Sequence, residues 1–192
     1  MNSITDAQRD MRVSYYAGAP GVISSATAWL IAALIALVIS PKAGVLTLIF
    51  GGMLIFPFAT ILCKLIGVSG IHSKGNPLAP LAIEGTFWML ISIPVAVGAA
   101  LYRVEWFFPA MLFVIAGRYL TFSTLYGMRL YWIFAVALFI SGWVLLSTST
   151  PAFLGAFTGA LIEYCFGLII FFTYKLEQPY KLLKNDVEDD TA

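Results

Sequence analysis

The chain has 192 residues, of which 60% are hydrophobic and 11% charged, and its formal net charge is +1. Soluble domains usually carry about 25% charged residues, so this composition excludes an ordinary water-soluble fold. A net charge near zero, without a basic surface interleaved with aromatic residues, also excludes a nucleic-acid partner. The sequence therefore predicts one integral membrane protein whose first partner is the lipid bilayer.

Residues 1–19 form an N-terminal segment ahead of the first apolar run. Ser3 and Asp6 make a weak helix-capping pattern, and Tyr15 and Tyr16 have the amphipathic rings that favour a membrane interface. A short interfacial helix and a disordered tail both fit this segment.

Apolar runs that follow are long enough to cross a bilayer as helices, which takes roughly 20 residues each. They cover residues 20–40, 44–63, 81–102, 106–126, 130–147 and 152–174. We therefore predict an all-α bundle of six transmembrane helices. Residues 175–192 form a polar tail, and we expect its acidic end to be solvated and disordered.

Internal prolines interrupt two of these runs. Pro57 follows the pair Gly51 and Gly52, and Pro94 lies in the third run. We expect the middle of the second helix to be bent or partly unwound. A packing kink would leave the freed carbonyl to neighbouring helices. Transporters, alternatively, use interrupted helices to expose backbone groups at a binding site.

Basic residues are distributed unevenly between the two sides that six crossings define. Eight of them share a side with both termini, and they are Arg9, Arg12, Lys64, Lys74, Arg129, Lys175, Lys181 and Lys184. Lys42 and Arg103 lie on the other side. The positive-inside rule then places both termini in the cytoplasm. Short loops without appended domains favour a multi-pass protein of the bacterial inner membrane.

Two ionisable side chains, Arg118 and Glu163, fall deep inside predicted helices. At about 1.5 Å of rise per residue, Arg118 is roughly 18 Å and Glu163 roughly 16–17 Å from the same side. An ion pair between them is therefore available at mid-membrane, and ionisable residues at that depth indicate a functional site. The remaining candidate residues of this site are Glu84, Thr121, Thr124 and Tyr164.

Small residues recur at four-residue spacing on two of the predicted helices. The last helix carries Gly155, Gly159 and Gly167, and the first carries Ala28, Ala32 and Ala36. Such faces let another helix approach closely inside a bilayer. The approaching helix could belong to this chain, to a second copy or to a partner membrane protein.

Sequence signatures of enzymes and metal sites are missing from this chain. His72 is its single histidine, and Cys63 and Cys165 lie in separate apolar runs. Metal cages need clustered ligands, and no nucleotide-binding or metalloprotease motif occurs. We therefore predict no enzymatic activity, no metal and no cofactor.

Two hypotheses for function remain. In the first, the protein is a transporter or transport-complex subunit for a proton, an ion or a small polar solute. Glu163 would take up and release a proton, or coordinate the ion or solute, and Arg118 would be its counter-charge. Size and span count resemble those of the substrate-binding subunits of vitamin uptake transporters, although the outer turns here are shorter.

In the second hypothesis, the protein is a scaffold, assembly factor or partner subunit, and the charge pair is structural. Access of water to Glu163 distinguishes the two.

Overall fold

The computed structural model describes the backbone of residues 3–148 and 150–189, and the side chains of that part up to Leu176. All regular structure within it is helical. The helices are α1 (Ile4–Tyr15), α2 (Ala19–Val38), α3 (Pro41–Leu65), α4 (Ala79–Tyr102), α5 (Phe107–Tyr126), α6 (Leu130–Ser147) and α7 (Ala152–Asp189), with the 3-10 turns η1 (Tyr16–Gly18) and η2 (Val104–Trp106). Six helices are long and apolar enough to cross a membrane when α1 and α2 are counted as one, which confirms the all-α prediction.

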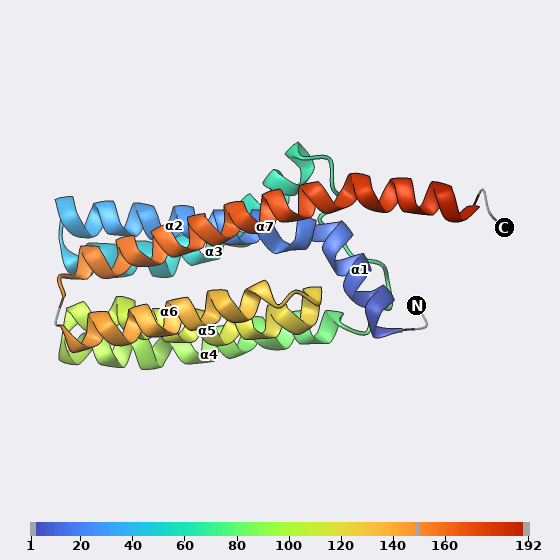
Figure 1. Ribbon diagram of the computed structural model, residues 1–192. Helices are drawn as coiled ribbons and strands as arrows, with labels where there is room; N and C mark the ends of the chain where they lie inside the picture. The colour runs from blue at the N-terminus through green and yellow to red at the C-terminus, as the bar shows by residue number, and fades with distance from the viewer. Residues whose placement is uncertain (1–2, 149, 190–192) are drawn as a thin grey trace.

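The helices form two halves that lie side by side (Figure 1). One half contains α2, α3 and α7, in which α2 packs against both of its neighbours. The other half contains α4, α5 and α6, with α5 in the middle. Contacts between the halves are made mainly by α7 with α5 and α6, whereas α3 and α4 make little contact with each other. The bundle is therefore more loosely joined on its α3–α4 side.

The glycine face of α7 is packed inside the bundle. A Cβ atom at Gly159 would lie 2.5 Å from the indole ring of Trp29 on α2. A Cβ atom at Gly155 would lie 3.0 Å from Phe108 of α5. Gly167 is similarly close to α2, where Ile23 lies 3.0 Å from the position of the missing atom. The helices can approach this closely because the glycines have no side chains.

The alanine face of α2 is also occupied within the chain. A Cβ atom at Gly44 of α3 would lie 2.5 Å from the Cβ atom of Ala36, and one at Gly51 would lie 3.6 Å from that of Ala28. Ala32, between them, is fully buried. Neither small-residue face is therefore available to a partner protein or a second copy.

The expectation that the second helix is partly unwound is wrong, and so is the expectation of a disordered C-terminal tail. α3 and α4 run unbroken through Pro57 and Pro94, although α3 diverges from α2 toward its C-terminal end (Figure 1). A proline removes one intrahelical hydrogen bond, and the bonds before and after it keep the helix intact. The C-terminal tail is helical as far as Asp189, because Leu, Glu, Gln and Lys are good helix formers. The side chains of Lys181 and Lys184, and residues 190–192, lie outside the described part.

α1 lies across one end of the bundle, which is also the end that α7 extends beyond (Figure 1). The side chain of Gln8 donates a hydrogen bond of 2.8 Å to the carbonyl of Thr124, and Arg12 donates to the carbonyl of Tyr126. These carbonyls belong to the last turn of α5, where the helix itself supplies no donors. α1 therefore caps α5, and connects the two halves at this end.

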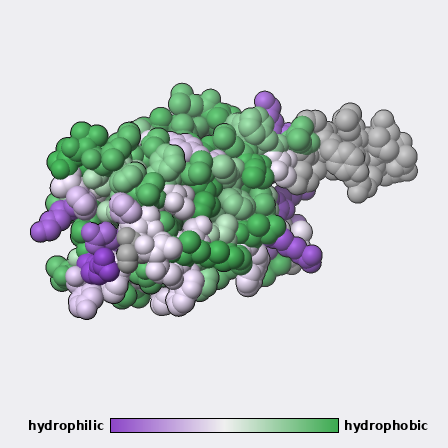
Figure 2. Space-filling view, turned by 60° about the vertical axis from the view of Figure 1, so that its left-hand side comes forward, coloured by the Kyte–Doolittle hydropathy of each residue, from purple (hydrophilic) through white to green (hydrophobic). Residues whose placement is uncertain are grey.

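Apolar side chains cover much of the molecular surface. Figure 2 shows hydrophobic residues over most of the face in view, with hydrophilic residues gathered toward the two ends. Large exposed apolar residues include Phe50 and Phe58 on α3, Phe87 and Ile91 on α4, and Phe139 on α6. Monomeric soluble proteins rarely expose apolar patches of this extent. The surface is therefore of the kind that a multi-pass membrane protein presents to lipid.

Candidate functional site

A cavity of about 480 Å³ lies between the two halves. Its walls come from α2, α3, α4 and α5, and one end is bounded by α1 and by the loop of residues 66–78 between α3 and α4. Ligand sites usually have volumes of about 300–1,000 Å³ and mainly apolar walls. Methionine, leucine, isoleucine and phenylalanine side chains supply most of this wall, so the cavity has the size and lining of a ligand site.

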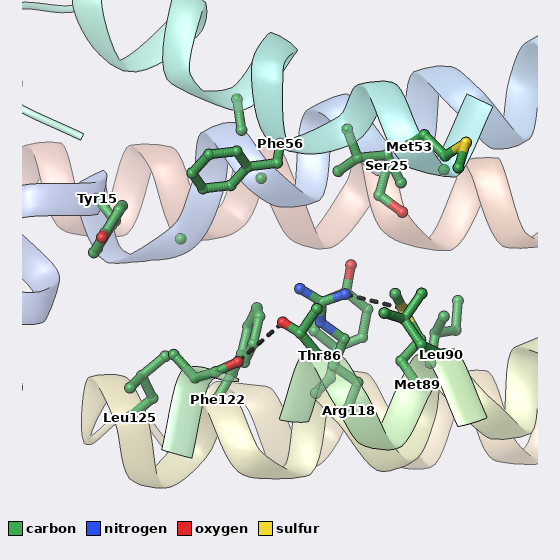
Figure 3. Close-up of a pocket in the computed structure, with 18 of the residues that line it drawn as sticks. Tyr15, Ser25, Met53, Phe56, Thr86, Met89, Leu90, Arg118, Phe122 and Leu125 are labelled. Carbon is green, nitrogen blue, oxygen red and sulfur yellow. Dashed lines mark hydrogen bonds between the residues drawn. The ribbon is translucent and has the colours of Figure 1, made fainter. Parts of the chain in front are cut away.

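Arg118 brings a positive charge into this apolar space. Its side chain extends from α5 toward the opposite half, beside Met89 and Phe122 (Figure 3). Nη1 lies 2.9 Å from the sulfur of Met89, and the guanidinium carbon lies 5.6 Å from the centre of the Phe122 ring. Among the described residues, no carboxylate lies within 4.0 Å of it. A thioether and an aromatic ring are weak partners for a guanidinium, which suits bidentate binding of a carboxylate or phosphate.

Hydroxyl groups are the other main polar groups of the cavity wall. Ser25, Thr60, Thr86, Tyr119 and Tyr126 all line it. The hydroxyl of Thr86 donates to the carbonyl one helical turn earlier, at 2.9 Å, and that of Thr60 does the same. These bonds satisfy the two threonine donors locally, and Arg118 is the one lysine, arginine or acidic side chain among the described residues that line the cavity.

Glu163 is fully buried next to this wall, without lining the cavity itself. Its Oε1 accepts a hydrogen bond of 2.7 Å from the hydroxyl of Tyr119, and its Oε2 has no hydrogen-bond partner within the described part. Ser25 lies beside the same carboxyl group. Tyr119 and Ser25 therefore stand between Glu163 and the cavity.

The predicted ion pair between Arg118 and Glu163 is wrong. The two residues do lie on different helices at similar depth, but the guanidinium extends into the cavity while the carboxyl group is enclosed behind Tyr119. Depth along a helix comes directly from residue counting, whereas the direction of a side chain around the helix depends on which neighbours pack there.

The other predicted site residues do not join Arg118 in the cavity. Glu84 and Thr124 are exposed. The hydroxyl of Thr121 donates to the carbonyl of Arg118 on the same helix at 2.7 Å. The hydroxyl of Tyr164 lies 2.8 Å from a threonine hydroxyl of α2, and so connects α7 to α2. None of these four residues lines the cavity.

The α1 end of the cavity is closed by contacts that the sequence did not reveal. The hydroxyl of Tyr15 lies 2.8 Å from Nδ1 of His72, and both residues line the cavity. Asp10 accepts hydrogen bonds from the hydroxyl of Ser73 at 2.7 Å and from the amide of Asn76 at 2.6 Å. We call Asp10, Ser73 and Asn76 the α1–loop clasp. It holds the loop against α1 and thereby holds His72 against Tyr15.

Sequence analysis also missed Tyr119 as the partner of Glu163. Tyr119 directly follows Arg118, and the one available signal was that a buried carboxylate needs a donor.

No group of three or more histidine, cysteine or acidic side chains that could hold a metal ion occurs in the part of the chain that the structure describes.

Comparison with known proteins gives a family assignment. No curated protein and no solved structure matches the chain. One family model matches residues 4–173, from the start of α1 into α7, and the chain therefore belongs to the family of unknown function DUF7010.

Proposed function

We propose that the protein is a multi-pass membrane protein that binds a small anionic solute at Arg118 and transports it, alone or as a subunit of a transport complex. The observation that carries this proposal is the guanidinium group of Arg118 inside a cavity of about 480 Å³, where its nearest partners are a thioether and a phenyl ring. A positive charge in such surroundings is costly unless an anion accompanies it. A bound solute with a carboxylate or phosphate group would supply that anion.

The proposed site lies in a cell membrane, with α1 on the cytoplasmic side. Arg9, Lys64, Lys74 and Arg129 are exposed residues at the α1 end of the bundle, whereas Lys42 begins α3 at the opposite end. This distribution supports a cytoplasmic α1 end under the positive-inside rule. The shared position of α1 and the C-terminal half of α7 supports both termini on that side (Figure 1).

The cavity wall favours a solute with an apolar body over a bare proton or metal ion. Water-filled ion paths need a succession of polar groups, and most of this wall is hydrocarbon. Glu163, which sequence analysis placed at the centre of an ion site, is enclosed behind Tyr119. The transported species is therefore an organic anion whose apolar part fills the cavity.

Thermal unfolding of the purified protein tests the binding step. A panel of small organic anions, with neutral and cationic analogues of the same carbon skeleton, should be added to the native chain and to Arg118→Met. Arg129→Met is the matched control, since it removes an exposed arginine at the start of α6. Ligands that prefer the folded state raise its melting temperature. We expect anions alone to stabilise the native chain and the control, and to leave Arg118→Met unchanged.

Transport itself is tested by flux of the stabilising anion into proteoliposomes. The native chain and Arg129→Met should accelerate uptake, and Arg118→Met should not. If no anion distinguishes the native chain from Arg118→Met in either assay, the solute hypothesis is wrong. The protein would then act as a scaffold or partner subunit, the second hypothesis that the sequence raised.

A further inference from the structure

The cavity is open on its side, between α3 and α4. Met53 and Phe56 of α3 line it and are nevertheless 73% and 71% exposed, and Leu90 of α4 lines it and is 48% exposed. A residue that both lines a cavity and faces outward marks a mouth. We call these three residues the lateral mouth. Figure 3 shows them on the two facing halves, with Arg118 between those halves.

Helix packing explains why the mouth lies there. α3 and α4 make little contact with each other, so no close helix contact seals this side. Pro57, next to Phe56, has no N–H group, and the carbonyl of Met53 therefore lacks its usual intrahelical donor. α3 diverges from α2 toward its C-terminal end (Figure 1).

The two ends of the cavity are filled by side chains. At the α1 end, Tyr15 and His72 face each other at 2.8 Å, held by the α1–loop clasp. At the other end, Trp29 packs against Phe108 with ring centres 5.9 Å apart, and Phe107 packs edge-on against Phe108. A molecule that approaches from the side meets neither of these closures. In a bilayer, that side would face hydrocarbon chains, because α3 and α4 both span the membrane there.

Charge and lining together define the chemistry of the occupant. Arg118 is the one lysine, arginine or acidic side chain among the described residues that line the cavity, and the walls around it are mainly apolar. A hydrocarbon chain matches those walls, and a single carboxylate or phosphate matches the guanidinium. Both features belong to single-chain anionic amphiphiles, which dissolve in the bilayer itself.

We propose that a single-chain amphiphile with a carboxylate or phosphate head group enters from the bilayer through the lateral mouth and places its head group at Arg118. This inference rests on the proposed binding of an anion at Arg118, and adds the substrate class and the route. The head group replaces the sulfur of Met89 as the principal partner of the guanidinium. The hydrocarbon chain occupies the apolar part of the cavity.

Photolabelling in nanodiscs tests the route. The native chain is placed in phosphatidylcholine nanodiscs that contain hexadecanoic acid with a diazirine at mid-chain, and the labelled residues are identified by mass spectrometry. We expect labels on α3 and α4 around the lateral mouth. Hexadecanoate and hexadecyl phosphate should compete at least about tenfold better than hexadecanol, because a charge-assisted hydrogen bond exceeds a neutral contact by that factor or more. This preference should vanish in Arg118→Met and persist in Arg129→Met.

Equal competition by hexadecanol, or labels confined to the outward face of α6 around Phe139 and Ile140, would show ordinary boundary lipid and overturn the inference. Leu90→Trp narrows the mouth and should reduce labelling from the bilayer several-fold. Octanoate, a short-chain probe added from water, reports anion binding at Arg118 at equilibrium, and it should stabilise both the native chain and Arg129→Met. If octanoate stabilises the protein through Arg118 but the bilayer probe does not label the mouth, anion binding stands and the lateral route is wrong. If neither probe acts through Arg118, both proposals fail.

Discussion

The hydroxyl of Tyr119 donates a 2.7 Å hydrogen bond to Oε1 of Glu163, and this bond joins α5 to α7 behind the wall of the cavity. Glu163 is fully buried, and Ser25 of α2 lies beside the same carboxyl group. A buried polar group that loses its partner costs more than the bond itself contributes. The pair is therefore a sensitive point in the contact between the two halves.

Tyr119→Phe should lower the free energy of unfolding by about 1–3 kcal/mol, because it leaves the Glu163 carboxyl group without that donor. Chemical unfolding in mixed micelles, followed by tryptophan fluorescence, measures the change. Tyr164→Phe is the matched control, since it removes the hydroxyl of a less buried tyrosine on α7 and should cost less than about 1 kcal/mol. The double variant with Glu163→Gln should lose less than the sum of the two single changes. Strict additivity would show that the two groups do not interact.

Gly159→Ala should destabilise the bundle, because the added Cβ atom would lie 2.5 Å from the indole ring of Trp29. Trp29 is 2% exposed, and its ring would have to shift to accommodate the added atom. Overpacking of this kind costs about 1–3 kcal/mol, and the same unfolding assay measures it. Gly98→Ala in α4 is the control, because nothing lies within 4 Å of its added atom and alanine favours a helix. An equal effect of the two changes would mean that α7 and α2 are not in close contact at this position.

The helices could be predicted from composition and apolar run length, since crossing a bilayer requires a minimum length and leaves few alternatives to a helix. The depths of Arg118 and Glu163 followed from the same counting. Their directions did not follow, because a bundle of six helices has many possible neighbour arrangements. Sequence periodicity is weak here as well, since both sides of most helices are apolar. The cavity depends on those arrangements, and so was not predictable.

The α1–loop clasp shows the same limit at longer range. Asp10 and Asn76 are 66 positions apart in the chain, and no local pattern connects them. Polar residues in the segment before the first run and in the loop were visible in the sequence. Their pairing depends on how α1 turns back across the end of α5, and that turn depends on three residues with positive φ.

Asp10→Ala should release the loop of residues 66–78 from α1. Ser73 donates both its hydroxyl and its backbone N–H to this carboxylate, at 2.7 and 3.1 Å. Loss of these bonds should speed amide hydrogen exchange in the loop by about tenfold, the factor that corresponds to one or two ordinary hydrogen bonds. Asp6→Ala is the control, because Asp6 is an exposed acidic residue of the same helix outside the clasp. Unchanged exchange in Asp10→Ala would show that the loop is held by other contacts.

Gly18→Ala should lower the free energy of unfolding by disturbing the turn between α1 and α2, and its effect should exceed that of Gly21→Ala in the first turns of α2. Gly18 has a φ of +86°, and an added Cβ atom would lie 2.6 Å from the hydroxyl of Tyr131 and 2.8 Å from the ring of Tyr126. The left-handed backbone alone costs an alanine about 1–2 kcal/mol, and the contacts add to that. Gly21→Ala, with open space around its added atom, is the matched control and should be neutral or slightly stabilising.

Tyr131→Phe separates the two causes of the Gly18→Ala effect. Alone, it should cost about 1 kcal/mol or more, because its hydroxyl donates a 2.7 Å hydrogen bond to the buried carbonyl of Ala17. Combined with Gly18→Ala, it removes the atom nearest the new Cβ, so the loss in unfolding free energy should be smaller than the sum of the single losses. Backbone strain at Gly18 persists in the double variant, which should therefore remain less stable than Tyr131→Phe alone. Full additivity would assign the effect to backbone strain and to the contact with Tyr126, and would contradict the close contact between the turn and the Tyr131 hydroxyl of α6.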